Sequence, residues 1–479
     1  MSCGYDARMD PLYAPLQARL TGAVFTPDQF GRDLLTNFGH IHHWTPRFVV
    51  EPRTPQDVVE VVRFAREHGL PVSTRGAGHS QSQLAISQGG ILLAMQALSK
   101  ILHVDQRAHT VDVEGGVVWR DLVHFLKKFS LVPRVLTNNL GVTIGGTLSI
   151  AGIGVASFKY GSQGDNVVEM DVVTGAGDLV TCSPEENTDL FWSTIAGLGQ
   201  VGIIVRARLQ LRRMKAMTRT YYLLYDDVRR FLDDAKQAMD AGAWDHLESW
   251  ASPSVQGTKP VEGRRQVFAR WFFPFHLTVE FDAGSPPDDR ALLAPLKPYE
   301  HLYTDDLPTI DFLERLLPVF ELWKRAGTWE HVHPWMETVL PWETAATYIE
   351  QVLVDLSPAV QVGGHVLLWP AKGTTSRSRL FMRPEGEDLV GFGILPAIPP
   401  QYWAQMKPML AGASDLSILM GGKRYLSGWI EFDLPTWKAH FGARWDWMKA
   451  CKRRFDPDHL LNPGFVPDEV DRPAPVEGR

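Results

Sequence analysis

The sequence predicts an α+β protein of two or three domains, and three observations lead to this fold class. The chain has 479 residues, whereas one domain has roughly 100–200 residues. Hydrophobic residues make up 44% of the chain and charged residues 22%, a composition that supports a large buried core. Predicted strands and helices do not alternate strictly along the chain, so a simple parallel doubly wound sheet is not expected.

The first half of the chain contains short strands and helices in mixed order. Residues 47–70 combine a strand, a helix start at Thr54-Pro55 and an amphipathic helix with a valine-rich apolar face. The stretch 167–182 is divided by Gly175 and Gly177 like a hairpin. The other strands are predicted at residues 71–76, 91–98, 110–118 and 203–211, and helices at residues 119–129 and 187–197.

The pattern changes around residues 212–226, which indicates a second structural unit. Proline-rich connections separate the elements that follow. These elements are a helix at residues 227–242, a strand at 265–282, a helix from Ile310, strands around 362–370 and 389–396, a helix from Gln401, and a last helix and turn within 440–464.

Composition and charge exclude several classes of protein. Subtracting 55 acidic from 48 basic residues gives a net charge of −7, and no basic tract is present, which argues against a nucleic-acid partner. No run of 18 or more apolar residues exists, so no membrane partner is expected. The start of the chain lacks a secretory apolar stretch and the three cysteines cannot form a disulfide framework. We therefore expect a cytoplasmic protein.

One glycine motif is a misleading match. Residues 197–202, GLGQVG, fit the pattern G-x-G-x-x-G, which in nicotinamide-binding proteins follows a strand and precedes a helix. Here a predicted helix precedes the motif and a β-branched strand follows it. A tight helix-to-strand turn is the favoured interpretation, although its backbone N–H groups could still meet a phosphate.

Two other glycine-rich loops are better candidates for a cofactor site. RGAGHSQSQLA, residues 75–85, follows a strand, and its glycines let the backbone approach a ligand closely. TIGGTLSIAGIG, residues 143–154, has side chains too small for ordinary core. Two such loops about 70 residues apart in the chain indicate one extended, phosphate-bearing cofactor that spans both.

These residues carry a resemblance to a known family. The sequence resembles flavoproteins with the vanillyl-alcohol-oxidase (PCMH-type) FAD fold, the superfamily that includes berberine bridge enzyme, and within it the cytokinin dehydrogenases. The segments that carry the resemblance run from about residue 47 to 464: RGAGHS, GGTLSIAGIG, NVVEMDVVTGAGDLVTCS, NTDLFWSTIAGLGQVGIIVRARL, HPWMETVLP and FDPDHLLNPG.

The resemblance implies a discontinuous FAD domain and a substrate domain. The FAD domain comprises residues 1–213 and a C-terminal return at 425–479, and the substrate domain, residues 214–424, has an antiparallel sheet with flanking helices. Matching the motifs implies a set of cofactor-binding residues, to which the composition of the first loop adds Gln83. The set is Gly76, Ala77, Gly78, His79, Ser80, Gln83, Gly146, Thr147, Ser149, Gly152, Ile203, Ile204, Tyr425 and Asn462.

His79 matches the histidine that, in this family, is bonded covalently to the flavin. Relatives with a second, cysteinyl link carry a thiol shortly before the GG pair, but here that stretch reads TNNLGVTIGG. A single histidyl link is therefore implied. Oxygen or a quinone is the expected electron acceptor.

Two residues match the catalytic positions of cytokinin dehydrogenases. In that family an aspartate before GGTLS takes a proton from the substrate amine, but Asn138 stands at this position, and an amide cannot accept that proton near neutral pH. Glu248 matches the assisting glutamate, although a solvated surface carboxylate is an equal alternative. This departure favours a substrate other than a cytokinin.

Three functions therefore stay open. The first is an FAD-dependent oxidoreductase that tailors a small secondary metabolite, for instance by oxidative decarboxylation, in which Arg270 or His331 could hold the carboxylate. The second is cytokinin dehydrogenase-type oxidation, and the third is a flavin-free binding protein. His331 and His333 are interpreted as architectural rather than as metal ligands, and no metal is expected. Of 16 tryptophans, nine lie from Trp244 to Trp403, and some of these are expected to line a pocket for a flat substrate.

Overall fold

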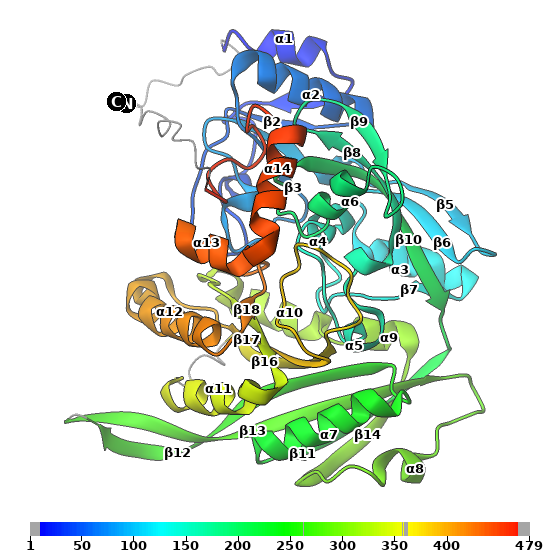
Figure 1. Ribbon diagram of the computed structural model, residues 1–479, viewed down its shortest axis with the longest axis vertical. Helices are drawn as coiled ribbons and strands as arrows, with labels where there is room; N and C mark the ends of the chain where they lie inside the picture. Colours follow the sequence, from blue (N-terminus) through cyan, green and yellow to red (C-terminus); the bar gives the residue numbers. More distant parts are fainter. Residues whose placement is uncertain (1–9, 262, 357, 359–362, 468–479) are drawn as a thin grey trace.

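The computed structural model describes residues 10–261, 263–356, 358 and 363–467, which form three β-sheets with helices packed around them (Figure 1). The start of the chain, on which the expectation about secretion rests, lies outside the described residues, and so does Cys3. The mixed α+β class is confirmed.

The first sheet contains β1 (Ala23–Phe25), β2 (Phe48–Glu51), β3 (Val72–Arg75) and β4 (Ile91–Ala94), in the order β1-β2-β4-β3. Helix α1 (Tyr13–Ala18) precedes it, and α2 (Pro55–His68) joins β2 to β3. The predicted start of α2 is confirmed, because the side chains of Thr54 and Asp57 bond to each other's backbone N–H. Gly69, at a φ of +64°, ends the helix, and the valines of its apolar face are buried.

The second sheet holds the predicted hairpin and ends with a long strand. Its strands are β5 (Ile101–Asp105), β6 (Thr110–Glu114), β7 (Leu131–Pro133), β8 (Val167–Thr174), β9 (Leu179–Cys182) and β10 (Gly202–Arg213), in the order β5-β6-β10-β8-β9 with β7 also on β10. Its helices are α3 (Trp119–Leu126), α4 (Ile144–Leu148), α5 (Ser157–Tyr160) and α6 (Thr188–Thr194). GLGQVG is the predicted turn between a helix and a strand, since it joins α6 to β10.

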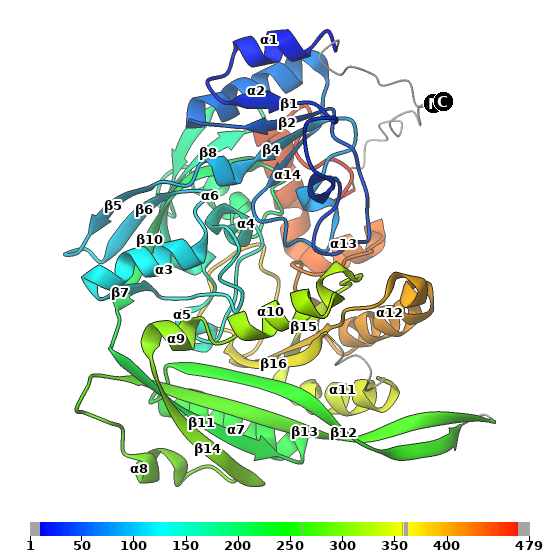
Figure 2. The ribbon, with the colours of Figure 1, turned by 180° about the vertical axis from the view of Figure 1, so that it is seen from behind.

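The third sheet is antiparallel and has eight strands. They are β11 (Met217–Tyr225), β12 (His246–Val261), β13 (Arg264–Phe281), β14 (Glu300–Pro308), β15 (Met336–Pro341), β16 (His365–Lys372), β17 (Asp388–Leu395) and β18 (Lys423–Arg424). Their order is β14-β11-β13-β12-β16-β17-β15-β18. The turn end of the long β12–β13 hairpin projects beyond the sheet (Figure 2).

Helices cover one face of the third sheet and leave the other face toward the first half of the molecule. The covering helices are α7 (Val228–Ala241), α11 (Trp342–Asp355) and α12 (Trp403–Leu419), and α8 (Asp289–Leu293) lies in the connection to β14. The helix predicted from Ile310 is two helices, α9 (Thr309–Leu313) and α10 (Leu317–Arg325), because Pro318 favours a new helix start. In the described part of the chain, no helix combines the length and the apolar character needed to cross a bilayer.

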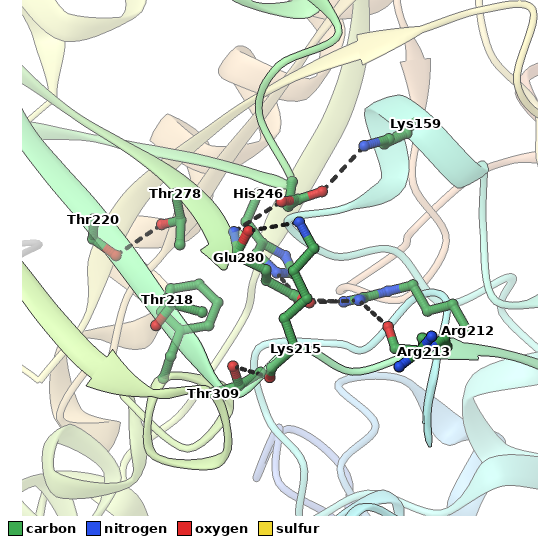
Figure 3. A network of polar contacts seen from close by, with 12 residues as sticks. Lys159, Arg212, Arg213, Lys215, Thr218, Thr220, His246, Thr278, Glu280 and Thr309 are labelled. Carbon is green, nitrogen blue, oxygen red and sulfur yellow. Dashed lines mark hydrogen bonds and ion pairs between the residues drawn. The ribbon is translucent and has the colours of Figure 1, made fainter. Parts of the chain in front are cut away.

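A buried ionic cluster joins the second sheet to the third (Figure 3). Arg212, near the end of β10, donates two hydrogen bonds to Glu280 of β13, at 2.7 and 2.5 Å, and the His246 ring nitrogen lies 2.9 Å from the same carboxylate. Burial by itself raises the pKa of Glu280, but the hydrogen bonds from His246 and Arg212 outweigh it and hold the pKa well below its usual range. The carboxylate is therefore ionised and anchors the junction.

The C-terminal segment returns to the first half, where α13 (Leu434–Phe441) and α14 (Trp445–Phe455) pack against the second sheet (Figure 1). The Asp456 carboxylate accepts bonds from Lys452 and from the backbone of Leu460 and Leu461. Leu461 forms a bridge with Val72 of β3. The organisation in two parts is confirmed, whereas the boundaries 1–213, 214–424 and 425–479 stay predictions.

Replacing Glu280 by alanine is expected to lower the free energy of unfolding by about 3–5 kcal/mol, because it leaves the Arg212 cation buried without its carboxylate. The matched control is Asp458→Ala, which removes a half-exposed pair with Arg66 and is expected to cost about 0–1 kcal/mol. Denaturant unfolding of both variants measures the difference, and equal losses would contradict the anchoring role.

Candidate active site

A cavity of about 290 Å³ lies between the first half of the chain and the third sheet. Both glycine-rich loops line it, together with α4, the turn at 197–202 and the inner face of the third sheet. All of the predicted site residues line this cavity except Gln83 and Gly152. The chain thus brings together, in one place, residues that the sequence analysis selected from six separate segments.

The first loop packs tightly against the side chains of Thr143 and Arg75. A Cβ on Gly76 would lie 2.0 Å from the Thr143 hydroxyl oxygen, and Gly78 has a φ of +72°. Arg75 closes the loop from behind, because its guanidinium donates to the backbone carbonyls of Thr36, Asp33 and Ala85. Residues 76–80 line the cavity, and the two glycines leave main-chain groups accessible there, which suits a phosphate-bearing ligand.

The second loop meets the first across the cavity. Thr147 is buried and accepts a 2.9 Å bond from the indole of Trp119. Gly145 and Gly146 line the cavity at the start of α4. A Cβ on Gly154 would lie 1.8 Å from the Leu136 carbonyl oxygen, so this segment also requires close backbone approach. The two loops form the two walls of one cradle.

Two predicted cofactor residues lie outside the cavity lining. Gln83 opens a short 3-10 helix at residues 83–85, and its neighbours Leu84 and Ala85 line the cavity instead. Gly152 has a φ of +69° and packs against Gln163. Its backbone N–H bonds to the hydroxyl of Tyr425, which does line the cavity.

His79 is buried in an aromatic box at the cavity wall. Its ring stacks on Phe38 with centroids 4.0 Å apart and lies 5.4 Å from Trp335. Burial lowers the pKa of His79 to about 4, so the imidazole is neutral near pH 7. Its Nε2 atom is buried and has no hydrogen-bond partner among the residues that the structure describes. A neutral, unpartnered ring nitrogen can act as a nucleophile toward a ligand.

A polar network connects the two predicted catalytic residues with one that the sequence analysis missed. The Asn138 amide donates to Glu248 over 2.5 Å. Arg315 donates to the other Glu248 oxygen over 2.7 and 3.0 Å, and to the Asn138 amide oxygen over 3.0 Å. Glu248 is therefore a buried, ion-paired carboxylate rather than a solvated one. Arg315 lies 67 residues from Glu248, in the turn between α9 and α10, and no local pattern marks it.

Glu337 is a second carboxylate at the cavity that the sequence analysis did not select. It lies in the HPWMETVLP segment and lines the cavity on β15. Burial raises its pKa to about 7, and a hydrogen bond from the Ser427 hydroxyl opposes that shift. The available sequence signal was an acidic residue within the mostly apolar segment METVLP, because a charged side chain in such a segment indicates a function.

Several other residues that the sequence analysis considered do not line the cavity. Arg270 is half-exposed and paired with Asp226, and neither Arg270 nor His331 lines the cavity. The His333 ring bonds to the backbone carbonyl of His331, and among the described residues no cluster of three or more His, Cys, Asp or Glu side chains could hold a metal. Of the nine tryptophans from 244 to 403, only Trp335 and Trp369 line the cavity.

Glycine-rich loops suited to phosphates, a neutral histidine and a mostly apolar cavity together indicate a cofactor-dependent enzyme, and sequence comparisons identify which kind. Residues 46–183 match the family described as FAD binding domain. Residues 290–466 match the family described as cytokinin dehydrogenase 1, FAD and cytokinin binding.

Individual relatives agree with these matches over nearly the whole chain. The oxidoreductase ORF5 in the fasciation locus of Rhodococcoides fascians is 31% identical over 93% of this chain and 99% of its own length. Cytokinin dehydrogenase 10 of Oryza sativa subsp. japonica is 30% identical over 90% of this chain and 85% of its own length. The chain belongs to the cytokinin dehydrogenase family of FAD-dependent oxidoreductases.

The residues present fit FAD. Besides His79, the Asn462 side-chain oxygen is buried without a partner at the cavity wall, and a Cβ on Gly76 would collide with the opposite loop. The two glycine loops would hold the pyrophosphate, and residues 198–204 would meet the nucleotide half. When bound, FAD supplies the acceptor for a hydride. The chain's own residues would position the group and set the polarity around it.

Replacing Gly76 by alanine is expected to abolish FAD binding, because the added methyl group collides with Thr143. The ratio of flavin to protein absorbance in the purified protein measures this loss. Gly412→Ala is the matched control, since a Cβ there meets nothing within 4 Å. The double variant Gly76→Ala/Thr143→Ala removes the colliding atoms and should regain flavin; full flavin content in the single variant would refute the close-approach argument.

Proposed function

We propose that this FAD-dependent oxidoreductase oxidises a carbon–nitrogen bond in a small, flat, uncharged molecule, with N6-substituted adenines of the cytokinin type as the first candidates. One observation carries the proposal. The described residues that line the cavity include two carboxylates, Glu248 and Glu337, and no lysine or arginine. An anionic substrate would enter a desolvated cavity without a lining cation to compensate it.

The relatives support this substrate class. Several proteins that share about 30% identity over most of this chain are named cytokinin dehydrogenases. Trp335 and Trp369 add flat apolar surface to the cavity, and the amide of Asn138 and the carboxylate of Glu248 offer polar contacts to ring or side-chain nitrogens. The alternative function as a flavin-free binding protein is not supported, because the relatives are named oxidoreductases and cytokinin dehydrogenases.

The tailoring of a secondary metabolite, with or without oxidative decarboxylation, stays a prediction. The cavity favours it less, because Arg315 is already neutralised by Glu248 and cannot hold a carboxylate as a free cation. Oxygen or a quinone as the electron acceptor, and a cytoplasmic location, also stay predictions.

The substrate proposal is tested by adding isopentenyladenine to the purified holoenzyme without oxygen. The visible absorbance of the flavin should bleach, because hydride transfer reduces it, whereas adenine, which lacks the side chain, should leave it unchanged. Failure of isopentenyladenine to bleach the flavin contradicts the proposal. Reduction by a carboxylated compound with one carbon dioxide released per flavin would favour decarboxylation instead.

We also propose a covalent bond between FAD and His79. Its support is the unpartnered Nε2 atom and the depressed pKa of this ring, which keep the nitrogen free to attack. The wild-type protein should keep its yellow colour after acid precipitation, and mass spectrometry should find a flavin adduct on the peptide that contains His79. His79→Ala should release all flavin into the supernatant, whereas His40→Ala, a control outside the cavity lining, should retain it.

A further inference from the structure

Glu337 is directed to the cavity by strand alternation. On β15 its neighbour Met336 is completely buried in the core of the third sheet, so the next side chain points to the opposite face. That face is the cavity, where Glu337 is 8% exposed. A strand in a closed core thus places one ionisable group among the cavity walls.

Two glycines make room for this side chain. On the neighbouring strand β17, Gly393 pairs with Glu337, and a Cβ there would lie 3.3 Å from the Glu337 Cγ. A Cβ on Gly428 would lie 3.6 Å from Oε2. The Ser427 hydroxyl donates to that same oxygen, which leaves Oε1 without a hydrogen bond among the described residues.

The charged and titratable groups around Glu337 come from the segment at 424–427. Arg424 is buried and donates to the backbone carbonyls of Glu337 and Trp429 and to the Ser414 hydroxyl, but to no carboxylate. Its positive charge favours the ionised form of Glu337, while burial opposes it. Burial raises the pKa of Tyr425, so this phenol stays protonated, and β17 contributes only Gly393 at this point.

The other polar groups of the cavity are committed to different tasks. Asn138 has no acid–base function near neutral pH. Glu248 uses one oxygen for Arg315 and the other for Asn138. His365 is half-buried and stacks on Trp323, and desolvation lowers its pKa to about 4. Of the described lining carboxylates, Glu337 is the one outside a direct ion pair.

We propose that Glu337 is the base of the reaction, an inference that rests on the proposed oxidation of a carbon–nitrogen bond. The substrate N–H bond breaks and its proton passes to the Glu337 carboxylate. The C–H bond of the adjacent carbon breaks as hydride, whose two electrons are accepted by FAD, the oxidant. The C–N single bond becomes C=N, so atoms and charge balance, and the position of Asn138 no longer needs a proton acceptor.

The test compares Glu337→Gln with wild type in anaerobic reduction by isopentenyladenine. Glutamine keeps the size of the side chain and an acceptor for Ser427 but cannot take the proton, so reduction should slow by roughly 10²–10⁴-fold. The wild-type rate should rise with pH through about 7, and the variant should lose that rise. Glu343→Gln, on the exposed first turn of α11, should match wild type.

Thermal unfolding of the same holoenzymes gives a readout that needs no substrate. Because folding raises the pKa of Glu337 to about 7, folded protein holds a proton that unfolded protein has lost between about pH 4.5 and 7. Its contribution to stability is therefore greatest at low pH and falls as pH rises to about 7. Glu337→Gln removes this pH-dependent contribution to stability, so the melting temperature of the variant should rise relative to that of wild type between about pH 5 and about pH 8.

The outcomes separate the two proposals. If isopentenyladenine reduces wild type and Glu337→Gln equally fast, or if the difference in melting temperature does not change with pH, Glu337 is not the base, while the proposed function stands. If isopentenyladenine does not reduce wild type, the proposed function fails and the role of Glu337 falls with it. The inference is supported if the flavin of Glu337→Gln is reduced slowly and independently of pH, and if the difference in melting temperature between variant and wild type depends on pH.

Discussion

The buried ionic junction between Arg212, Glu280 and His246 is the interaction on which the rest of the structure depends. It lies where the chain leaves the second sheet and enters the third. A carboxylate shielded from water keeps its charge only while both partners are in place, so the junction holds the two halves in one arrangement. The cavity is the space between them, and residues of both halves line it.

The two halves contribute different chemistry to this cavity. The first half contributes backbone, because glycines at 76, 78 and 145 bring main-chain groups to the wall of the cavity. The third sheet contributes side chains, which alternate between a covered apolar core and the cavity. Glu248 and Glu337 lie on different strands of that sheet, and their surroundings differ. One is neutralised by Arg315, and the other is influenced by Arg424 only at a distance.

Glu248 and Glu337 are both glutamates, but their different surroundings suit them to different roles. Arg315 donates two hydrogen bonds to one oxygen of Glu248 and Asn138 donates to the other, so the position of this carboxylate is fixed. A carboxylate desolvated by apolar walls exchanges its proton near neutral pH. The cavity therefore has a polar network at Asn138 and Glu248 and a titratable carboxylate at Glu337. Among the described residues, no lysine or arginine lines it.

The sequence alone determined the fold class, the helix start at Thr54, the hairpin at 167–182 and the two cofactor loops, because each depends on contacts between residues a few positions apart. It did not reveal Arg315 or Glu337. Their significance arises from neighbours such as Glu248 and Ser427, which lie 67 and 90 residues away along the chain. Only the packing of the third sheet against the first half decides which carboxylate is paired and which is desolvated. Desolvation depends on the surroundings of a side chain in the folded protein and not on its residue type.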